Sequence, residues 1–159
     1  MNQHTAISDS FDFEGDYGEG YEELARALIP GYLSSFRQAV ALLEGRIGSD
    51  PHVLVVGAGT GVEIITIQMI HPTWRCTGID PSRQMVDIAR DRIVEAGLGH
   101  SVELRNEYVH DLPRDIRFDA ATCFNVMHFL ADDGSKEMLL QSISDRLSSG
   151  ASFVLFDLH

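Results

Sequence analysis

Three glycines at alternate positions, Gly57, Gly59 and Gly61, follow an apolar run at residues 52–56 in the stretch VLVVGAGTG. Glycine lets the backbone approach a ligand closely, and a loop of this kind between a strand and a helix can direct backbone N–H groups toward the ligand. A dinucleotide-binding loop reads G-x-G-x-x-G, whereas position 62 is Val62. The pattern therefore favours a ligand without a pyrophosphate, whose uncharged or cationic part lies against the backbone.

An acidic residue, Asp80, follows a second predicted strand at residues 75–79 and lies 23 residues after Gly57. A carboxylate at the end of a second strand can accept hydrogen bonds from both hydroxyls of a ribose, and this offset is typical of a ribose-binding acid in a strand–helix–strand unit. The alternative is that Asp80 caps a helix that begins at Pro81-Ser82. Together with the glycine loop, Asp80 favours a ribose-containing ligand.

Three side chains at predicted strand ends are candidates for a general base: His128, His110 and Tyr108. Each has a surface or packing role as its alternative, and for His110 that role is the preferred interpretation. His128 is the better candidate because it begins the loop after the fourth predicted strand. No Cys–His or Ser–His–Asp arrangement is indicated, and the seven histidines have no spacing typical of a metal site. The sequence thus leaves the catalytic residue unknown and predicts no metal.

The elements that position these residues alternate between strand and helix after two N-terminal helices. The predicted strands cover residues 52–56, 75–79, 101–106, 118–126 and 151–158, and the helices that connect them cover residues 61–70, 81–97 and 135–150. The segment 61–70 would also suit a strand, but a parallel connection requires a helix there. The order predicts an α/β fold with a doubly wound, mostly parallel, Rossmann-like sheet, which binds ligands at the carboxyl ends of its strands.

Composition limits the remaining possibilities. Residues 1–19 are polar and acidic and predict a flexible segment, and residues 20–159 predict a single domain. The formal net charge of −12 argues against a broad nucleic-acid surface. No signal peptide or membrane span is visible, so a cytoplasmic protein is expected, with Cys76 and Cys123 as reduced, buried thiols.

At this point the chain resembles the class I S-adenosylmethionine-dependent methyltransferases. The stretches that carry the resemblance are VLVVGAGTG, GIDPSRQMVDIAR, FDAATCFNVMHFL and LLQSISDRLSSGASFVLFD, and the likeness covers about residues 50–158. The N-terminal stretch FDF…YEELARALIPGY resembles the branch that contains carboxy-S-adenosylmethionine synthase, a branch linked to tRNA uridine modification. That second likeness is shorter and less specific.

The resemblance implies that S-adenosylmethionine is the cofactor and that a small molecule is the methyl acceptor. The methyl group would be transferred by in-line displacement, which leaves S-adenosylhomocysteine as product. It also implies the binding residues: Gly57, Ala58, Gly59 and Gly61 for the methionine part, Asp80 for the ribose, Pro81 and Met85 for the adenine, Tyr108 and Val109 for the adenine amine, Phe124 and Asn125 where cofactor and acceptor meet, and Tyr32 as a cover from the N-terminal helices. After the third predicted strand, Glu107, Tyr108 and Asp111 are alternatives for the acidic contact that the family often has.

Two features depart from the family. Val55 stands where the family usually has an acid in the first strand, which puts the cofactor affinity in doubt. The chain ends after the fifth predicted strand, without the family's terminal antiparallel hairpin, so we expect either a truncated chain or a homodimer through an exposed apolar edge. The alternatives to a methyltransferase are a non-catalytic cofactor-binding module, a nicotinamide-dependent oxidoreductase and an enzyme that makes a modified S-adenosylmethionine.

Overall fold

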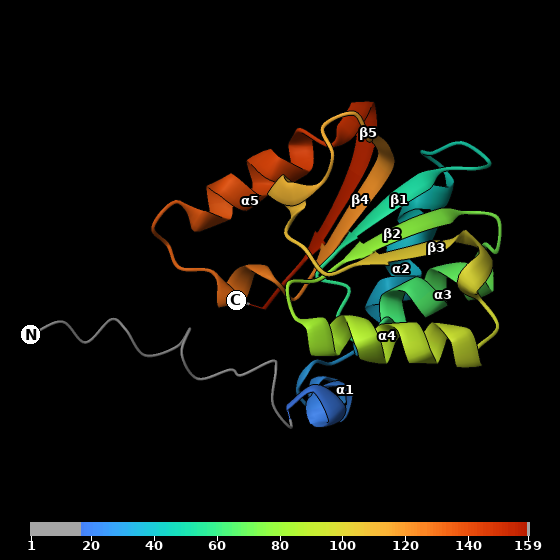
Figure 1. Ribbon diagram of the computed structural model, residues 1–159, viewed down its shortest axis with the longest axis vertical. Coiled ribbons are helices and arrows are strands. Elements are labelled where there is room, and N and C mark those ends of the chain that lie inside the picture. Colours follow the sequence, from blue (N-terminus) through green and yellow to red (C-terminus); the bar gives the residue numbers. More distant parts are fainter. Residues whose placement is uncertain (1–16, 159) are drawn as a thin grey trace, which may run out of the picture.

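The computed structural model describes residues 17–158, which form a five-stranded sheet with helices on both faces (Figure 1). The strand order is β3-β2-β1-β4-β5, and every neighbouring pair is parallel. The strands are β1 His52–Val56, β2 Arg75–Ile79, β3 Val102–Arg105, β4 Phe118–Phe124 and β5 Leu147–Phe156. This arrangement confirms the predicted doubly wound α/β fold.

The helices divide between the two faces of the sheet. They are α1 Tyr17–Leu28, α2 Tyr32–Glu44, α3 Val62–Ile70, α4 Arg83–Glu95 and α5 Ser135–Ser144, with short 3₁₀ turns η1 Gly99–Ser101, η2 Val109–Asp111 and η3 Met127–Phe129. Figure 1 shows α2, α3 and α4 on one face and α5 on the other. From β1 the chain builds outward to β2 and β3, and then returns to place β4 on the other side of β1. The ends of β1 and β4 are therefore the switch point, where such sheets bind ligands.

The segment 61–70 is a helix, as predicted, but the end of the chain differs from the prediction. The sequence predicts a helix over 135–150 with Leu147 on its apolar face, whereas α5 ends at Ser144 and Leu147 begins β5. Leu147 pairs with Phe118 of β4, and the register shifts before Ala120 pairs with Ser152. Pairing with a neighbouring strand thus overrides the helical spacing of the apolar residues.

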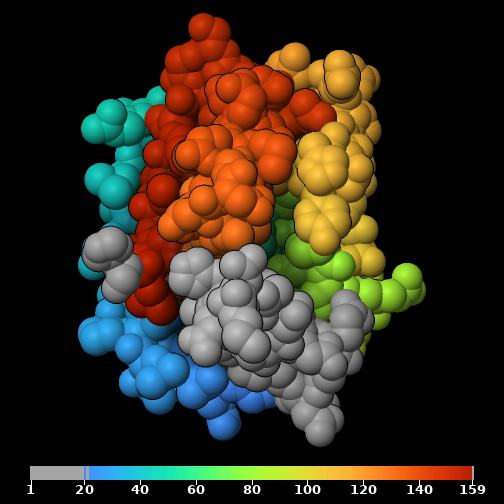
Figure 2. All heavy atoms as spheres, turned by 90° about the vertical axis from the view of Figure 1, so that its left-hand side faces the viewer, coloured from blue at the N-terminus to red at the C-terminus, as the bar shows by residue number. Residues whose placement is uncertain are grey.

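Strand β5 forms one edge of the sheet, as expected for the fifth predicted strand. Phe153 and Leu155 are each more than a third exposed, and Figure 2 shows β5 in red at the surface beside α5 in orange. A homodimer through this edge stays a prediction. At the other end, α1 begins at Tyr17, and residues 1–16 of the predicted flexible segment lie outside the described residues.

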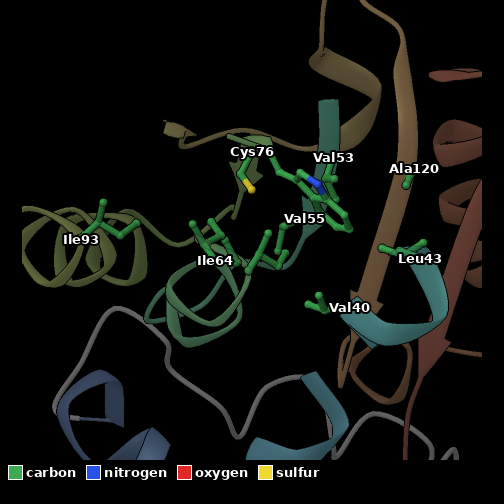
Figure 3. Close-up of a cluster of buried hydrophobic side chains, with 11 residues drawn as sticks. Val40, Leu43, Val53, Val55, Ile64, Cys76, Ile93 and Ala120 are labelled. Carbon is green, nitrogen blue, oxygen red and sulfur yellow. The ribbon is translucent and has the colours of Figure 1, made fainter. Parts of the chain in front are cut away.

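Two apolar clusters hold the sheet between its helices. Val53 and Val55 of β1 face α2, α3 and α4, where they pack with Leu43 and Ile64 (Figure 3). The intervening Leu54 and Val56 face α5 and belong to the second cluster. Burial on both faces explains why β1 is continuously apolar instead of alternating.

Both cysteines lie in the sheet as free, buried thiols, as predicted. Burial raises the pKa of the Cys76 and Cys123 thiols to about 12, so both are protonated at neutral pH. No helix in the part of the chain that the structure describes has the length and apolarity needed to cross a membrane.

Candidate functional site

A cavity of about 640 Å³ lies at the carboxyl ends of β1, β2 and β4. In Figure 2 it is the recess between α5 in orange and the segment around Val109 in yellow. Its volume falls within the range of small-molecule sites. The sequence-predicted residues that line it are Tyr32, Gly57, Ala58, Gly59, Asp80, Pro81, Met85, Tyr108, Val109, Phe124 and Asn125. Residues far apart in the sequence are thus gathered at the switch point.

The glycine loop bonds mainly to the protein itself. The N–H groups of Gly57 and Ala58 both donate to the Ile79 carbonyl oxygen at 2.9 Å, and the N–H of Gly61 donates to the Ala58 carbonyl oxygen at 2.9 Å. Gly57 has φ 69°, and a Cβ added there would lie 2.3 Å from Val126 Cγ2, so only glycine fits. The first two bonds hold the loop against β2 and the third closes the loop on itself. Contact of the loop with a ligand stays a prediction.

Asp80 ties the glycine loop to the end of β2. Its Oδ2 accepts the N–H of Gly59 and its Oδ1 accepts the N–H of Ser82, both at 2.9 Å, and the residue is buried. The N-cap of α4 is Ser82, whose hydroxyl accepts the N–H of Met85 at 3.3 Å. The carboxylate therefore braces two loops at the cavity wall, and the capping role considered for it belongs to Ser82.

Gly61 is the predicted binding residue that does not belong to the cavity wall. It has φ 82° and begins α3, and a Cβ added there would lie 3.0 Å from the Cβ of Ala89 in α4. The glycine therefore lets α3 and α4 approach closely. Its contact with a cofactor stays a prediction.

Aromatic side chains close the cavity on the α2 side. The ring of Phe36 lies 5.0 Å from that of Tyr32 and 5.1 Å from that of Phe124, and all three residues are buried. Phe36 is a cavity residue that sequence reasoning missed, although it lies on the predicted apolar face of this helix. Together these rings exclude water from one end of the cavity.

The opposite wall comes from the turn after β3. Val109 is buried, whereas Tyr108 is 57% exposed and its ring stacks on that of His110 at 5.4 Å. The carboxylate of Asp111 accepts the Tyr108 N–H at 3.3 Å, and Asp111 does not line the cavity. Glu107 is the acid of this turn that does line it. Glu107 is itself paired with Arg105 at 3.1 Å.

Glu63, in the first turn of α3, is a further lining residue that sequence reasoning missed. It is only 5% exposed, and burial raises the pKa of its carboxyl to about 7, although the Thr122 hydroxyl nearby partly favours the charged form. Its Oε1 has no hydrogen-bond partner among the described residues. The signal was present in the sequence, since Glu63 is the single acid in the apolar run GVEIITIQMI.

Tyr108 and His110 are among the residues that line the cavity, whereas His128 is not; it lies in η3, between the lining residues Val126 and Phe129. Its Nδ1 lies 2.6 Å from Asp157 Oδ1, at the end of β5, and the other carboxylate oxygen accepts the Met127 N–H at 2.6 Å. An ionised carboxylate can only accept, so Nδ1 is the donor in this contact and Nε2 takes no part in it. The structure thus joins the predicted base candidate to an acid from a distant segment.

The charge of the wall narrows the choice of ligand. Three carboxylates line the cavity, those of Glu63, Asp80 and Glu107, and no Lys or Arg is among the lining residues within the described chain. A pyrophosphate would meet repulsion from these acids and glycine-loop N–H groups that are already bonded. The wall favours a ligand with positive charge and apolar parts. Across residues 17–158, no group of three or more His, Cys, Asp and Glu side chains is arranged to hold a metal ion.

Comparisons with known proteins agree with this geometry. A model of the methyltransferase domain family matches residues 53–150. A curated relative, an uncharacterized protein of Synechococcus sp., is 27% identical over 134 residues, which cover 80% of this chain and 31% of that protein. The family match begins at β1, so the likeness of the N-terminal stretch to the carboxy-S-adenosylmethionine synthase branch stays a prediction.

Solved structures share the fold. An S-adenosylmethionine-dependent methyltransferase from Clostridium acetobutylicum superposes with a TM-score of 0.69 at 21% identity, covering 87% of this chain and 55% of that one. A second, from Thiobacillus denitrificans in complex with S-adenosylhomocysteine, gives 0.62 at 20% identity, covering 77% and 47%. The chain thus spans about half the length of these structures and about a third of the curated relative.

Proposed function

The chain belongs to the methyltransferase domain family, and on that premise we propose that it binds S-adenosylmethionine in the cavity and transfers the sulfonium methyl group to a small-molecule acceptor. The observation that carries the proposal is the acidic wall, with Glu63, Asp80 and Glu107 and without Lys or Arg among the described lining residues. S-adenosylmethionine has a sulfonium and an ammonium group, so this wall suits it and disfavours a nicotinamide dinucleotide.

The remaining lining residues fit the other parts of this cofactor. Asp80 lines the cavity, and ribose hydroxyls can donate hydrogen bonds to its carboxylate oxygens. Pro81, Met85 and Val109 offer apolar surface beside Asp80 for a flat adenine ring. Asp80 would therefore hold the loop and the ribose with the same carboxylate.

Bound S-adenosylmethionine supplies a methyl group on a sulfur that is already a good leaving group. The chain has to align the acceptor with that methyl group and exclude water. The buried rings of Tyr32, Phe36 and Phe124 provide a dry wall. Phe129, Leu130, Met138 and Leu139 line the side toward α5, which favours an acceptor with an apolar body.

We assign His128 as the base that removes a proton from a hydroxyl or amine acceptor, with Asp157 as its positioning residue. The support is the 2.6 Å contact between His128 Nδ1 and Asp157 Oδ1, which leaves Nε2 as the ring nitrogen that would take the proton. For an acceptor found by screening hydroxyl- and amine-bearing molecules for S-adenosylhomocysteine formation, we expect His128→Asn to lower kcat by about a hundredfold. Asp157→Asn should lower it less, with S-adenosylhomocysteine affinity unchanged in both variants. An unchanged kcat in His128→Asn would reject this role.

The cofactor assignment is tested by calorimetric titration of S-adenosylhomocysteine and, separately, NADH. We expect micromolar binding of the first and none of the second. Asp80→Ala should weaken binding at least tenfold, or about 1.4 kcal/mol. Glu103→Gln, which removes the same charge from an exposed site on β3, is the matched control and should bind as the unaltered chain does. Binding of NADH, or of neither ligand by a folded chain, would reject the proposal.

A further inference from the structure

Glu63 is a buried carboxylate for which the described chain provides no cation. None of the ion pairs among residues 17–158 includes it. Its Oε1 lacks a hydrogen-bond partner there, and the residue is only 5% exposed. A buried acid without a partner is unfavourable, and proteins normally pair it with a cation or with several donors. Because Glu63 lines the cavity, a ligand can provide that partner.

A second acceptor without a partner lies on the same cavity. Asn125, immediately after β4, is 4% exposed, and its Oδ1 has no hydrogen-bond donor among the described residues. Its backbone is fixed, since its N–H donates to the Phe156 carbonyl oxygen at 2.8 Å. Next to Glu63 lies the buried Thr122 hydroxyl, which favours the charged form of the Glu63 carboxyl. Two acceptors of lining residues, Glu63 Oε1 and Asn125 Oδ1, therefore lack donors in the described chain.

The other two carboxylates of the wall differ from Glu63. Asp80 accepts backbone N–H groups at both oxygens, and Glu107 is paired with Arg105. Only Glu63 combines nearly full burial with an oxygen that lacks a donor in the described chain. A positively charged part of the ligand is therefore expected beside α3.

The missing partner must bring both positive charge and N–H donors. A sulfonium has the charge but no N–H group, and a ribose hydroxyl has a donor but no charge. An ammonium group has both, with three N–H bonds. The amino-acid end of S-adenosylmethionine and S-adenosylhomocysteine carries such a group.

We propose that Glu63 binds the ammonium group at the amino-acid end of the cofactor, with the Asn125 side-chain oxygen as a second acceptor. This inference rests on the proposed function. It identifies the residue by which the chain would distinguish the cofactor from an adenosine thioether that lacks the amino-acid end. Glu63, in the first turn of α3, is then a determinant of cofactor specificity. Its unfavourable burial in the free chain is offset when the ammonium arrives.

The test compares two ligands by calorimetry. S-adenosylhomocysteine has the amino-acid end, whereas 5′-methylthioadenosine has the same adenosine and thioether without it. In Glu63→Gln, we expect S-adenosylhomocysteine to bind at least tenfold more weakly and 5′-methylthioadenosine to bind within twofold of the unaltered chain. Glu103→Gln is again the control for net charge and should change neither affinity.

Each other outcome has a distinct meaning. If Glu63→Gln binds S-adenosylhomocysteine normally, or weakens both ligands equally, the inference is wrong while the cofactor assignment stands. If the unaltered chain binds neither ligand, the proposed function fails and the inference fails with it. Retained binding of 5′-methylthioadenosine shows in the same experiment that the variant is folded.

Discussion

Two buried acids of the same cavity, Asp80 and Glu63, show how differently a fold can use a carboxylate. Asp80 accepts the N–H groups of Gly59 and Ser82, each at 2.9 Å, and thereby holds two loops in place. Glu63 is just as buried, yet its Oε1 lacks a donor in the described chain and its pKa is raised to about 7.

The two acids differ in their hydrogen bonds because they lie at different positions in the fold. Asp80 follows β2 at a point where the glycine loop and the start of α4 bring backbone donors toward it. Glu63 lies in the first turn of α3, where no donor of the described chain reaches its Oε1 and the Thr122 hydroxyl is a polar neighbour. The first acid is satisfied by the fold, whereas the second depends on what enters the cavity.

The largest effect is expected when the satisfied acid is removed. Asp80→Ala removes the acceptor of one buried and one half-buried N–H group, which should lower the free energy of unfolding by about 3 kcal/mol. Asp80→Asn keeps one side-chain oxygen and should lose about half as much. Urea denaturation measures both. An alanine variant as stable as the unaltered chain would show that Asp80 does not brace the loops.

A smaller effect of opposite sign is expected for Glu63→Gln in the absence of ligand. The carboxyl pKa is about 7 in the folded chain and 4.5 ordinarily, so the folded state binds more protons between these values. Its contribution to stability is present below pH 4.5 and is lost as the pH rises to 7, a difference of roughly 3 kcal/mol. The buried amide also lacks partners, so we expect the variant to be about 1–2 kcal/mol more stable at pH 8.

The pH dependence separates this effect from general changes in packing. The stability difference between Glu63→Gln and the unaltered chain should be small at pH 4.5, grow through pH 6 and level off above pH 8, as measured by urea denaturation. Other groups titrate in the same range, among them His52, whose pKa is lowered by burial and by Arg75. Their contribution cancels in the difference. A difference independent of pH would contradict the assigned ionisation of Glu63.

The smallest effect is expected at Thr122, beside Glu63. Thr122→Val replaces the buried hydroxyl beside the Glu63 carboxyl with a methyl group of similar size. At pH 5, where Glu63 is largely neutral, we expect a gain of about 0.5 kcal/mol. At pH 8 the gain should shrink, because the hydroxyl favours the charged carboxylate. A larger gain at pH 8 than at pH 5 would argue against this coupling.

The sequence was sufficient for features set by local pattern. The strand β1 was predicted at its observed residues because a continuous apolar run that ends at a glycine is a strong signal, and β2 was also predicted at its observed residues. The same holds for most of the cavity wall, since the order of elements brings the ends of β1, β2 and β4 together. The assignment of Leu147 was wrong, because its helical spacing could not reveal a pairing with Phe118.

The sequence was insufficient where a residue's role depends on a distant neighbour. Nothing in the local pattern joins His128 to Asp157, 29 positions later, or shows that Glu63 lacks a partner. The expectation that Val55 weakens cofactor binding considered only the first strand, whereas an acid can reach the cavity from α3. The sequence-predicted contacts of the individual binding residues stay predictions until a ligand is seen in place.

The most direct measurement is a crystal structure of this chain with S-adenosylhomocysteine. We expect the ribose hydroxyls at Asp80 and the ligand's amino nitrogen within about 2.7–3.2 Å of Glu63 Oε1, the range of a hydrogen bond. A ligand elsewhere on the surface would contradict the proposed function. A ligand in the cavity whose amino group lies away from Glu63 would keep the cofactor assignment but contradict the comparison between the two acids.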